Sequence, residues 1–273
     1  MKLGRSPSPD LLSVSLSATD YVGHTYGPGG QEMCLQLLEL DREIGDFLSF
    51  LDRTGVDYAV ALSADHGGLD LPERLRARGV PGAARVDPGL SATAVGKRIG
   101  QKLGLSGPVL IGDFIGDVYI DKALRPADRT RVLGEALADY RAHAQVAAAY
   151  SRAQIAKTGM PSGNPVGWTL LQKARASFDP ERSGDIVMML KPHIMPVVDT
   201  SRYAATHGSP WDYDRRVPIA FWRKGHFPSA REDPVETADI MPTLAAMLGL
   251  PLGAPAIDGR CLDNVLGNAC PAR

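Results

Sequence analysis

The stretch that decides the fold is Tyr58-Ala59-Val60-Ala61-Leu62-Ser63-Ala64-Asp65-His66-Gly67-Gly68. It begins with an apolar run of strand length and ends in two polar side chains, and the two glycines that follow permit a tight turn. Before it, segment 11–17 alternates apolar residues with serine, which predicts a strand. Residues 19–30 read as a loop, and segment 31–53 has the apolar spacing of an amphipathic helix. Strand, loop, helix and strand in this order predict an α/β protein with a largely parallel sheet.

The rest of the chain divides into an inserted part and a return to the α/β pattern. We expect residues 1–70 to form a metal-binding α/β core segment, 71–200 an inserted α+β subdomain, and 201–273 the return to the core. Periodicity predicts helices at 91–103, 126–144, 166–176 and 237–248, and strands at 108–113, 117–120, 146–152, 185–190 and 217–222.

Composition excludes several classes of partner. The chain has 273 residues, a formal net charge of −1 and 44% hydrophobic residues. It therefore lacks the basic excess of a protein that binds nucleic acid duplexes or anionic membranes. Its apolar runs are far shorter than the roughly 20 residues that span a bilayer. No apolar region of a secretory signal peptide follows Met1–Asp10, so we expect neither a membrane anchor nor a signal peptide in this sequence.

The chain has three cysteines and no C-x-x-C pair, which disfavours a zinc ribbon. Cys34 falls in a helical pattern, as a small core residue does. Cys261 and Cys270 lie nine residues apart in the tail. They form either a structural disulfide, which implies an oxidising compartment, or two unrelated thiols.

Two pairs of potential metal ligands stand out. Asp20 and His24, four residues apart, offer an oxygen and a nitrogen donor to one ion, and zinc accepts both. Asp65 and His66 stand directly after an apolar strand, where α/β proteins bind ligands. The alternative interpretations are a helix-capping Asp20 beside a surface histidine, and a turn Asp65 beside a bystander histidine.

A third candidate, His207, lies in the loop Thr206-His207-Gly208-Ser209-Pro210. With the two pairs it makes a set of three histidines and two aspartates, more than the three protein ligands of one catalytic zinc. Five ligands suit two ions that share a substrate during phosphoryl displacement. We interpret the remaining histidines as structural or exposed; they are His143, His193 and His226.

The joint occurrence of three segments resembles one protein family. Ser17-Ala18-Thr19-Asp20-Tyr21-Val22-Gly23-His24, Ser63-Ala64-Asp65-His66-Gly67-Gly68 and His207-Gly208-Ser209-Pro210-Trp211-Asp212-Tyr213-Asp214 look like the alkaline phosphatase superfamily. The resemblance is strongest to bacterial monomeric alkaline phosphatases near the type I phosphodiesterase/nucleotide pyrophosphatase branch, and it covers their C-terminal half. It implies part of an alkaline-phosphatase-like α/β/α sandwich.

The resemblance also implies a ligand set. Asp20, His24 and His207 would hold one Zn²⁺, and Asp65 and His66 another whose site is incomplete in this chain. Ca²⁺ or Mg²⁺ can accompany zinc in such proteins. The family's Thr or Ser nucleophile belongs to the N-terminal half and has no counterpart here, so we assign no catalytic residue.

The implied activity is zinc-dependent hydrolysis of phosphate monoesters, with small phosphate esters as substrates and an N-terminal half as the missing partner. Two alternatives stay open: a phosphodiesterase or nucleotide pyrophosphatase of the same superfamily, and a catalytically inactive truncated fragment. An unrelated binding domain with scattered histidines is disfavoured by the three ordered motifs. Full-length members of the family are periplasmic or secreted.

Overall fold

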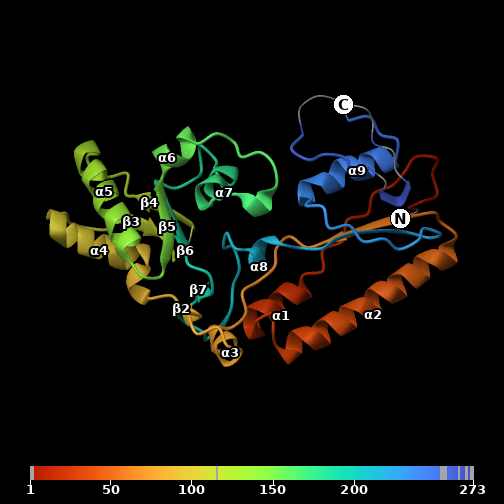
Figure 1. The fold of residues 1–273 in the computed structure, drawn as a ribbon, viewed down its shortest axis with the longest axis horizontal. Coiled ribbons are helices and arrows are strands. Elements are labelled where there is room, and N and C mark those ends of the chain that lie inside the picture. The colour runs from red at the N-terminus through yellow and green to blue at the C-terminus, as the bar shows by residue number, and fades with distance from the viewer. Residues whose placement is uncertain (1–2, 115, 253–256, 264, 268–269, 271–273) are drawn as a thin grey trace. The chain divides into compact units, whose positions relative to one another are not determined.

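The computed structural model describes residues 3–114, 116–252, 257–263, 265–267 and 270 (Figure 1). The chain forms two compact units, and each is described by itself. The four-strand unit comprises Thr19–Cys34 and Gly68–Arg215. The strand-pair unit comprises Met1–Ala18, Leu35–Gly67 and Arg216–Arg273.

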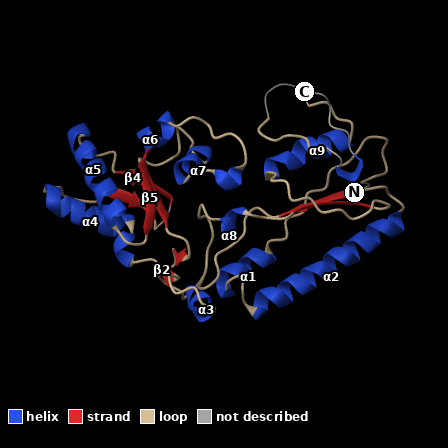
Figure 2. Cartoon of the chain, viewed as in Figure 1, coloured by secondary structure: helices blue, strands red, loops and turns tan. Residues whose placement is uncertain are grey.

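The four-strand unit is built on an antiparallel sheet of order β3-β4-β6-β5 (Figure 2). Helices α4 and α5 pack against this sheet and bury an apolar cluster that includes Val95, Val118 and Tyr140. α4 starts at the Ser91 cap and stops at the left-handed Gly104, as caps predict. The bounds are β3 Leu110–Gly112, β4 Gly116–Ile120, β5 Val146–Ser151, β6 Ile186–Leu190, α4 Ala92–Leu103 and α5 Pro126–Ala142.

Shorter elements complete this unit. Strands β2 (Ala84–Arg85) and β7 (Ile194–Met195) form a parallel pair beside a small core of Leu69, Met195 and Ala205. Parallel pairing among the described residues is confined to this pair. The helices are α1 Ala18–Tyr26, α3 Pro72–Ala77, α6 Arg152–Lys157, α7 Leu170–Ala176 and α8 Asp212–Arg215, with 3-10 turns at Pro88–Leu90 and Pro165–Gly167.

The strand-pair unit joins β1 (Ala59–Ser63) to β8 (Ile219–Arg223) in an antiparallel ladder. Most of helix α2 (Gln31–Thr54) belongs to it, and α9 (Ile240–Met247) follows a 3-10 turn at Thr237–Asp239. Another 3-10 turn spans Val265–Gly267. Cys261 and Cys270 form a disulfide, which confirms one of the two interpretations of these thiols.

Most expected elements are confirmed, and two are wrong. Segment 11–17 pairs with no strand among the described residues, because alternation alone supplies no hydrogen-bonding partner. Segment 19–30 is not all loop: residues up to Tyr26 belong to helix α1, which ends at the left-handed Gly27. The expected domain boundaries stay a prediction. No described helix has both the length and the apolar character needed to cross a bilayer.

Candidate metal centre

Helix α1 places the first two predicted ligands on one face. Asp20 and His24 are four residues apart, so one helical turn stacks their side chains. The His24 Nε2 atom lies 3.5 Å from the Asp20 Oδ1 atom. The segment read as a loop therefore presents its pair through helical geometry, which fixes their spacing more firmly than a loop would.

Three hydrogen bonds to the segment before His207 hold His24 at two of its atoms, the ring Nδ1 and the carbonyl oxygen. Its Nδ1–H donates to the carbonyl oxygen of Ala205 at 2.8 Å. The backbone N–H groups of Ala204 and Ala205 both donate to the His24 carbonyl oxygen at 2.9 Å. Because the carbonyl fixes the proton on Nδ1, the Nε2 lone pair is left to bind a metal, as in many histidine sites.

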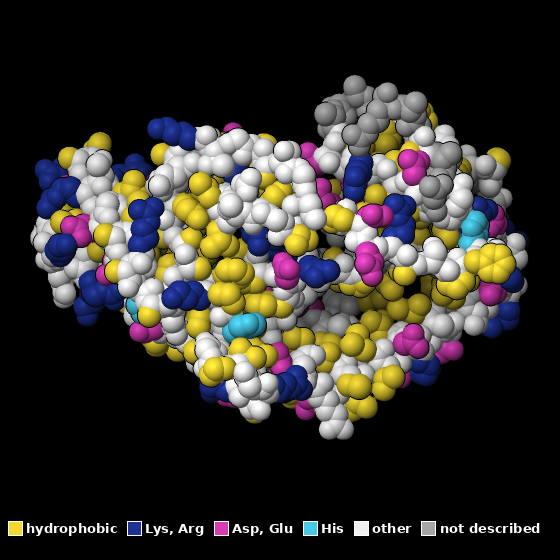
Figure 3. All heavy atoms as spheres, in the orientation of Figure 1, with side chains coloured by type: hydrophobic (Ala, Val, Ile, Leu, Met, Phe, Trp, Pro, Cys, Tyr) yellow, Lys and Arg dark blue, Asp and Glu magenta, His cyan; other side chains and the backbone are white. Residues whose placement is uncertain are grey.

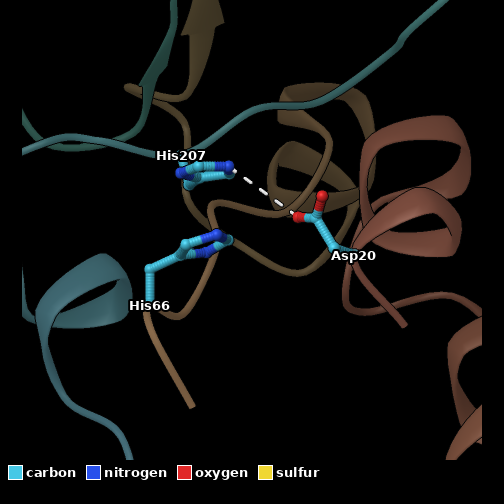
Figure 4. A group of neighbouring side chains, drawn as sticks. All are labelled: Asp20, His66 and His207. Carbon is cyan, nitrogen blue, oxygen red and sulfur yellow. Dashed lines mark ion pairs between the residues drawn. The ribbon is translucent and has the colours of Figure 1, made fainter. Parts of the chain in front are cut away.

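A network of hydrogen bonds shapes the loop that carries His207. Gly208 has φ 103°, a conformation that an L side chain would disfavour. The Ser209 N–H donates to Asp214 Oδ2 at 2.7 Å, and the Trp211 indole donates to the Leu190 carbonyl at 3.0 Å. This loop brings His207 Nε2 to 3.8 Å from Asp20 Oδ1. Figure 4 draws this ion pair as a dashed line; His66, drawn with it, belongs to the strand-pair unit.

The two separations measured from Asp20 are close to those between neighbouring ligands of a tetrahedral ion. Zinc bonds of about 2.0–2.1 Å place neighbouring ligand atoms about 3.3–3.4 Å apart in a tetrahedron. The 3.5 Å and 3.8 Å separations around Asp20 need only small rotamer changes to reach this. The side chains are 44% exposed for Asp20, 19% for His24 and 31% for His207, so a ligand can reach them. One oxygen and two nitrogens leave a fourth position for substrate or water.

Arg85 on β2 supports the segment that holds His24. Its Nη1 donates to the carbonyl oxygens of Val197 at 3.2 Å and Ala204 at 3.0 Å. The Glu73 carboxylate on α3 accepts hydrogen bonds from Nε and Nη2 of Arg85, at 3.0 and 3.1 Å. Burial raises the pKa of Glu73, but its own backbone N–H and Arg85 outweigh that and hold this pKa below its usual value. The bidentate pair therefore anchors the carbonyls beside His24.

Asp65 and His66 follow the end of β1 in the strand-pair unit. The His66 Nε2 atom lies 3.5 Å from Asp65 Oδ2, and its Nδ1–H donates to the Gly67 carbonyl at 2.8 Å. This repeats the arrangement of the first pair: a carbonyl fixes Nδ1, and Nε2 is directed to a carboxylate. A turn of the backbone after the strand allows neighbouring side chains to point the same way.

Sequence reasoning thus found side chains that the fold brings together. Asp20, His24 and His207 meet in the four-strand unit, and Asp65 pairs with His66. Their role as ligands stays a prediction. The supports supplied by Ala205 and Arg85 were missed, because a carbonyl and an arginine 119 residues from Ala204 leave no local pattern. Of the other histidines, His143 faces Asp87, His193 contacts Tyr213, and His226 is exposed.

Comparison with known protein families places the chain in one of them. Residues 2–210 match the family described as type I phosphodiesterase / nucleotide pyrophosphatase. The chain belongs to this family. The resemblance to the alkaline phosphatase superfamily is thereby confirmed, and so is its phosphodiesterase/nucleotide pyrophosphatase branch.

Relatives of the chain include named alkaline phosphatases. The chain is 51% identical to alkaline phosphatase PhoK of Sphingomonas sp over 98% of its own length and 48% of the relative. It is 46% identical to alkaline phosphatase PhoD of Zymomonas mobilis over 100% of the chain and 48% of the relative. It therefore spans about half the length of these relatives.

A solved structure shares the fold. Crystalline alkaline phosphatase PafA superposes with a TM-score of 0.79 at 25% identity, covering 97% of this chain and 49% of PafA. This likeness confirms the expected class, part of an alkaline-phosphatase-like α/β fold. Alkaline phosphatase relatives imply metal ions, and the ligand atoms of Asp20 and His207 lie within 4.8 Å of one another.

Proposed function

We propose that this chain supplies the zinc-binding part of an alkaline-phosphatase-type enzyme that hydrolyses phosphate monoesters. The convergence of Asp20, His24 and His207 in one unit carries the proposal, because zinc prefers nitrogen and carboxylate donors at this spacing. Bound zinc would act as a Lewis acid on a phosphoryl oxygen. The residues of the chain orient that ion: Ala205 fixes the His24 tautomer, and Asp20 supplies negative charge.

Asp65 and His66 would hold a second Zn²⁺ ion. Their 3.5 Å separation suits neighbouring ligands of one ion, yet two protein ligands are fewer than the three of a catalytic zinc site. We propose that the remaining ligands and the Thr or Ser nucleophile come from the half of the relatives that this chain does not cover. Ca²⁺ or Mg²⁺ would compete poorly at the histidine sites, since both prefer oxygen ligands.

The exposed face of α2 supports such a partner half. Over its 24 residues, α2 buries only Met33, and five large apolar side chains on it are exposed. Large exposed apolar patches mark interaction surfaces, and Figure 3 shows hydrophobic side chains at the surface of the visible face. We propose that the uncovered half, in the same chain or a separate one, packs here. The five are Leu35, Leu37, Leu38, Phe47 and Phe50.

The disulfide supports an oxidising location. Cys261–Cys270 would persist in the periplasm or outside the cell and would be reduced in most cytosols. We therefore propose a periplasmic or secreted enzyme. A phosphodiester or nucleotide pyrophosphate substrate is the second candidate, favoured by the family that residues 2–210 match.

Metal analysis tests the ligand assignment. Protein purified with excess zinc and then dialysed should retain zinc, and Asp20→Ala, His24→Ala and His207→Ala should each lower zinc affinity by at least about tenfold. The matched control, His226→Ala, removes an exposed histidine and should keep full zinc. Zinc at background in the parent chain, or equal zinc in His207→Ala and His226→Ala, would contradict the assignment.

Complementation tests the activity. We expect the chain alone to hydrolyse 4-nitrophenyl phosphate poorly or not at all. Co-expression with the uncovered half of PhoK should restore turnover, and His207→Ala should abolish it. Comparison with bis-4-nitrophenyl phosphate distinguishes monoesterase from diesterase activity. Robust turnover by the isolated chain would show that the nucleophile lies within it, and a stable but inactive complex would favour the inactive alternative.

A further inference from the structure

The four-strand unit contains a pocket that borders His207. Its volume is about 300 Å³, within the range of small-molecule sites. The walls include apolar side chains from β6 and from the segment before α7, among them Trp168, Met188 and Leu190. One rim consists of His207 and the residues that follow it. A molecule held here would extend from the predicted metal site into an apolar recess.

Three cationic residues line the same pocket: Lys173, Lys191 and Arg215. Lys173 on α7 donates from Nζ to the Pro210 carbonyl at 2.8 Å and lies 5.8 Å over the Trp211 ring. Arg215 at the end of α8 donates one hydrogen bond from Nη2 to the Pro165 carbonyl oxygen at 3.3 Å. An ammonium has three donors and a guanidinium five, so most of their donors remain for a ligand.

No carboxylate neutralises these cations at short range. In the part of the chain that the structure describes, neither Lys173 nor Arg215 forms an ion pair within 4.0 Å. Burial, and then the charge of Arg215, lowers the pKa of Lys173, against a smaller opposing effect of Asp212. An anion between the two side chains would relieve this repulsion.

The pocket also contains an unsatisfied acceptor. Asp214 is only 4% exposed, and its Oδ2 accepts from Ser209, but its Oδ1 has no hydrogen-bond partner among the described residues. A buried carboxylate oxygen without a donor is costly, which favours a ligand or water that offers a hydroxyl group. The pocket therefore combines an apolar wall, three cationic residues and a buried carboxylate oxygen that lacks a donor.

We propose that this pocket holds the leaving group of the substrate and selects an apolar or aromatic alcohol that carries a carboxylate. The carboxylate would lie between Lys173 and Arg215, and the ring against Trp168. This selection rests on the proposed phosphatase function, because His207 joins the pocket to the metal site.

Tryptophan fluorescence can test the pocket without turnover. Two of the three tryptophans of the chain, Trp168 and Trp211, line it or contact Lys173. Zinc-loaded protein would be titrated with 4-carboxyphenyl phosphate and with phenyl phosphate. We expect the carboxylate to strengthen binding about tenfold, as a charge-assisted hydrogen bond does. Benzoate should also bind after zinc is removed.

Charge-removing variants decide the outcome. Lys173→Met and Arg215→Met should each reduce the preference for the carboxylate to about one, with zinc content unchanged. The matched control, Lys122→Met, removes an exposed lysine and should keep the preference. Equal affinity for the two phosphates, or a preference that survives in both pocket variants, would overturn the pocket assignment. If the protein bound benzoate but took up no zinc, the pocket assignment would stand and the proposed phosphatase function would be refuted.

Discussion

At the residue scale, the site depends on side chains held by backbone groups. His24 is fixed through its ring and its carbonyl by Ala204 and Ala205, and Gly208 turns the loop beside His207. Asp70 fixes the loop between α1 and α2 in a similar way, because it accepts hydrogen bonds from the Gly29 N–H at 3.1 Å and from Arg74 at 2.5 Å. Small residues there leave room for a buried carboxylate.

Gly29→Ala should therefore destabilise the protein. The added Cβ would lie 2.2 Å from Asp70 Oδ2. The Asp70 carboxylate would have to move away, and its ion pair with Arg74 opposes that movement. We expect a loss of about 1–3 kcal/mol, as in other overpacked sites. Urea unfolding would measure it.

Gly45→Ala is the matched glycine control and should act in the opposite direction. Gly45 lies inside α2, and its added Cβ meets nothing within 4 Å. Alanine should stabilise the helix by roughly 0.5–1 kcal/mol. Equal effects of the two substitutions in the same urea titration would show that the close approach at Asp70 is not felt.

The sequence predicted Asp20, His24, Asp65, His66 and His207 as metal ligands because residue type and spacing together form a recognisable pattern, and their role as ligands stays a prediction. It could not identify Lys173 or Arg215 as pocket residues. They come from separate short helices, α7 and α8, and only the packing of these helices brings their side chains to one cavity.

At the element scale, apolar periodicity predicted the long helices well. It failed for segments whose structure depends on hydrogen bonds to distant parts of the chain. α2, α4 and α5 have regular apolar spacing, and all three were predicted within two residues. Segment 11–17 has strand alternation but no partner strand among the described residues, and the segment of α1 was read as loop because it is rich in glycine, tyrosine and histidine. Hydrogen bonding between distant segments decides such cases and leaves no local signal.

The ion pair between α3 and β2 should make stability depend on acid. The pKa of Glu73 is lower folded than unfolded, so its contribution is present above the unfolded value, about pH 4.3, and is lost as pH falls through the folded value. Glu73 is 51% exposed, so we expect less than about 1 kcal/mol at neutral pH.

Urea unfolding from pH 7 to pH 3 tests this ion pair. Glu73→Gln should be less stable than the parent at pH 7, and the two should converge as the pH falls through the folded pKa of Glu73. Glu181→Gln removes an exposed glutamate whose side chain makes no hydrogen bond in the described structure, and it should match the parent throughout. A gap for Glu73→Gln that stays constant with pH would exclude the ion pair as its cause.

At the scale of the whole molecule, the two units carry different tasks. The four-strand unit contains three predicted ligands and the pocket, whereas the strand-pair unit contains the disulfide and most of α2. The alkaline-phosphatase-like class could be recognised from motifs, because fold and ligand pattern occur together in this family. The division into units could not, since each unit is assembled from segments far apart in the chain.

This division predicts that the disulfide and the metal site respond separately. Replacing Cys261 and Cys270 by serine removes a short loop closure and should lower stability by about 2–3 kcal/mol in the strand-pair unit. Zinc bound by the four-strand unit should be unchanged. Calorimetry with zinc analysis would check both, and a loss of zinc along with stability would show that the units act as one.

The three hydrogen bonds that hold His24 have a consequence for how the site would take up zinc. Hydrogen bonds already fix the carbonyl and the ring nitrogen of His24, so this side chain loses little conformational entropy when zinc binds. We therefore expect zinc binding to be fast and, in calorimetry, driven by enthalpy with a small entropic cost. A chelator should then empty the centre without scrambling it. Repeated cycles of zinc removal and reloading would recover the same zinc content and affinity.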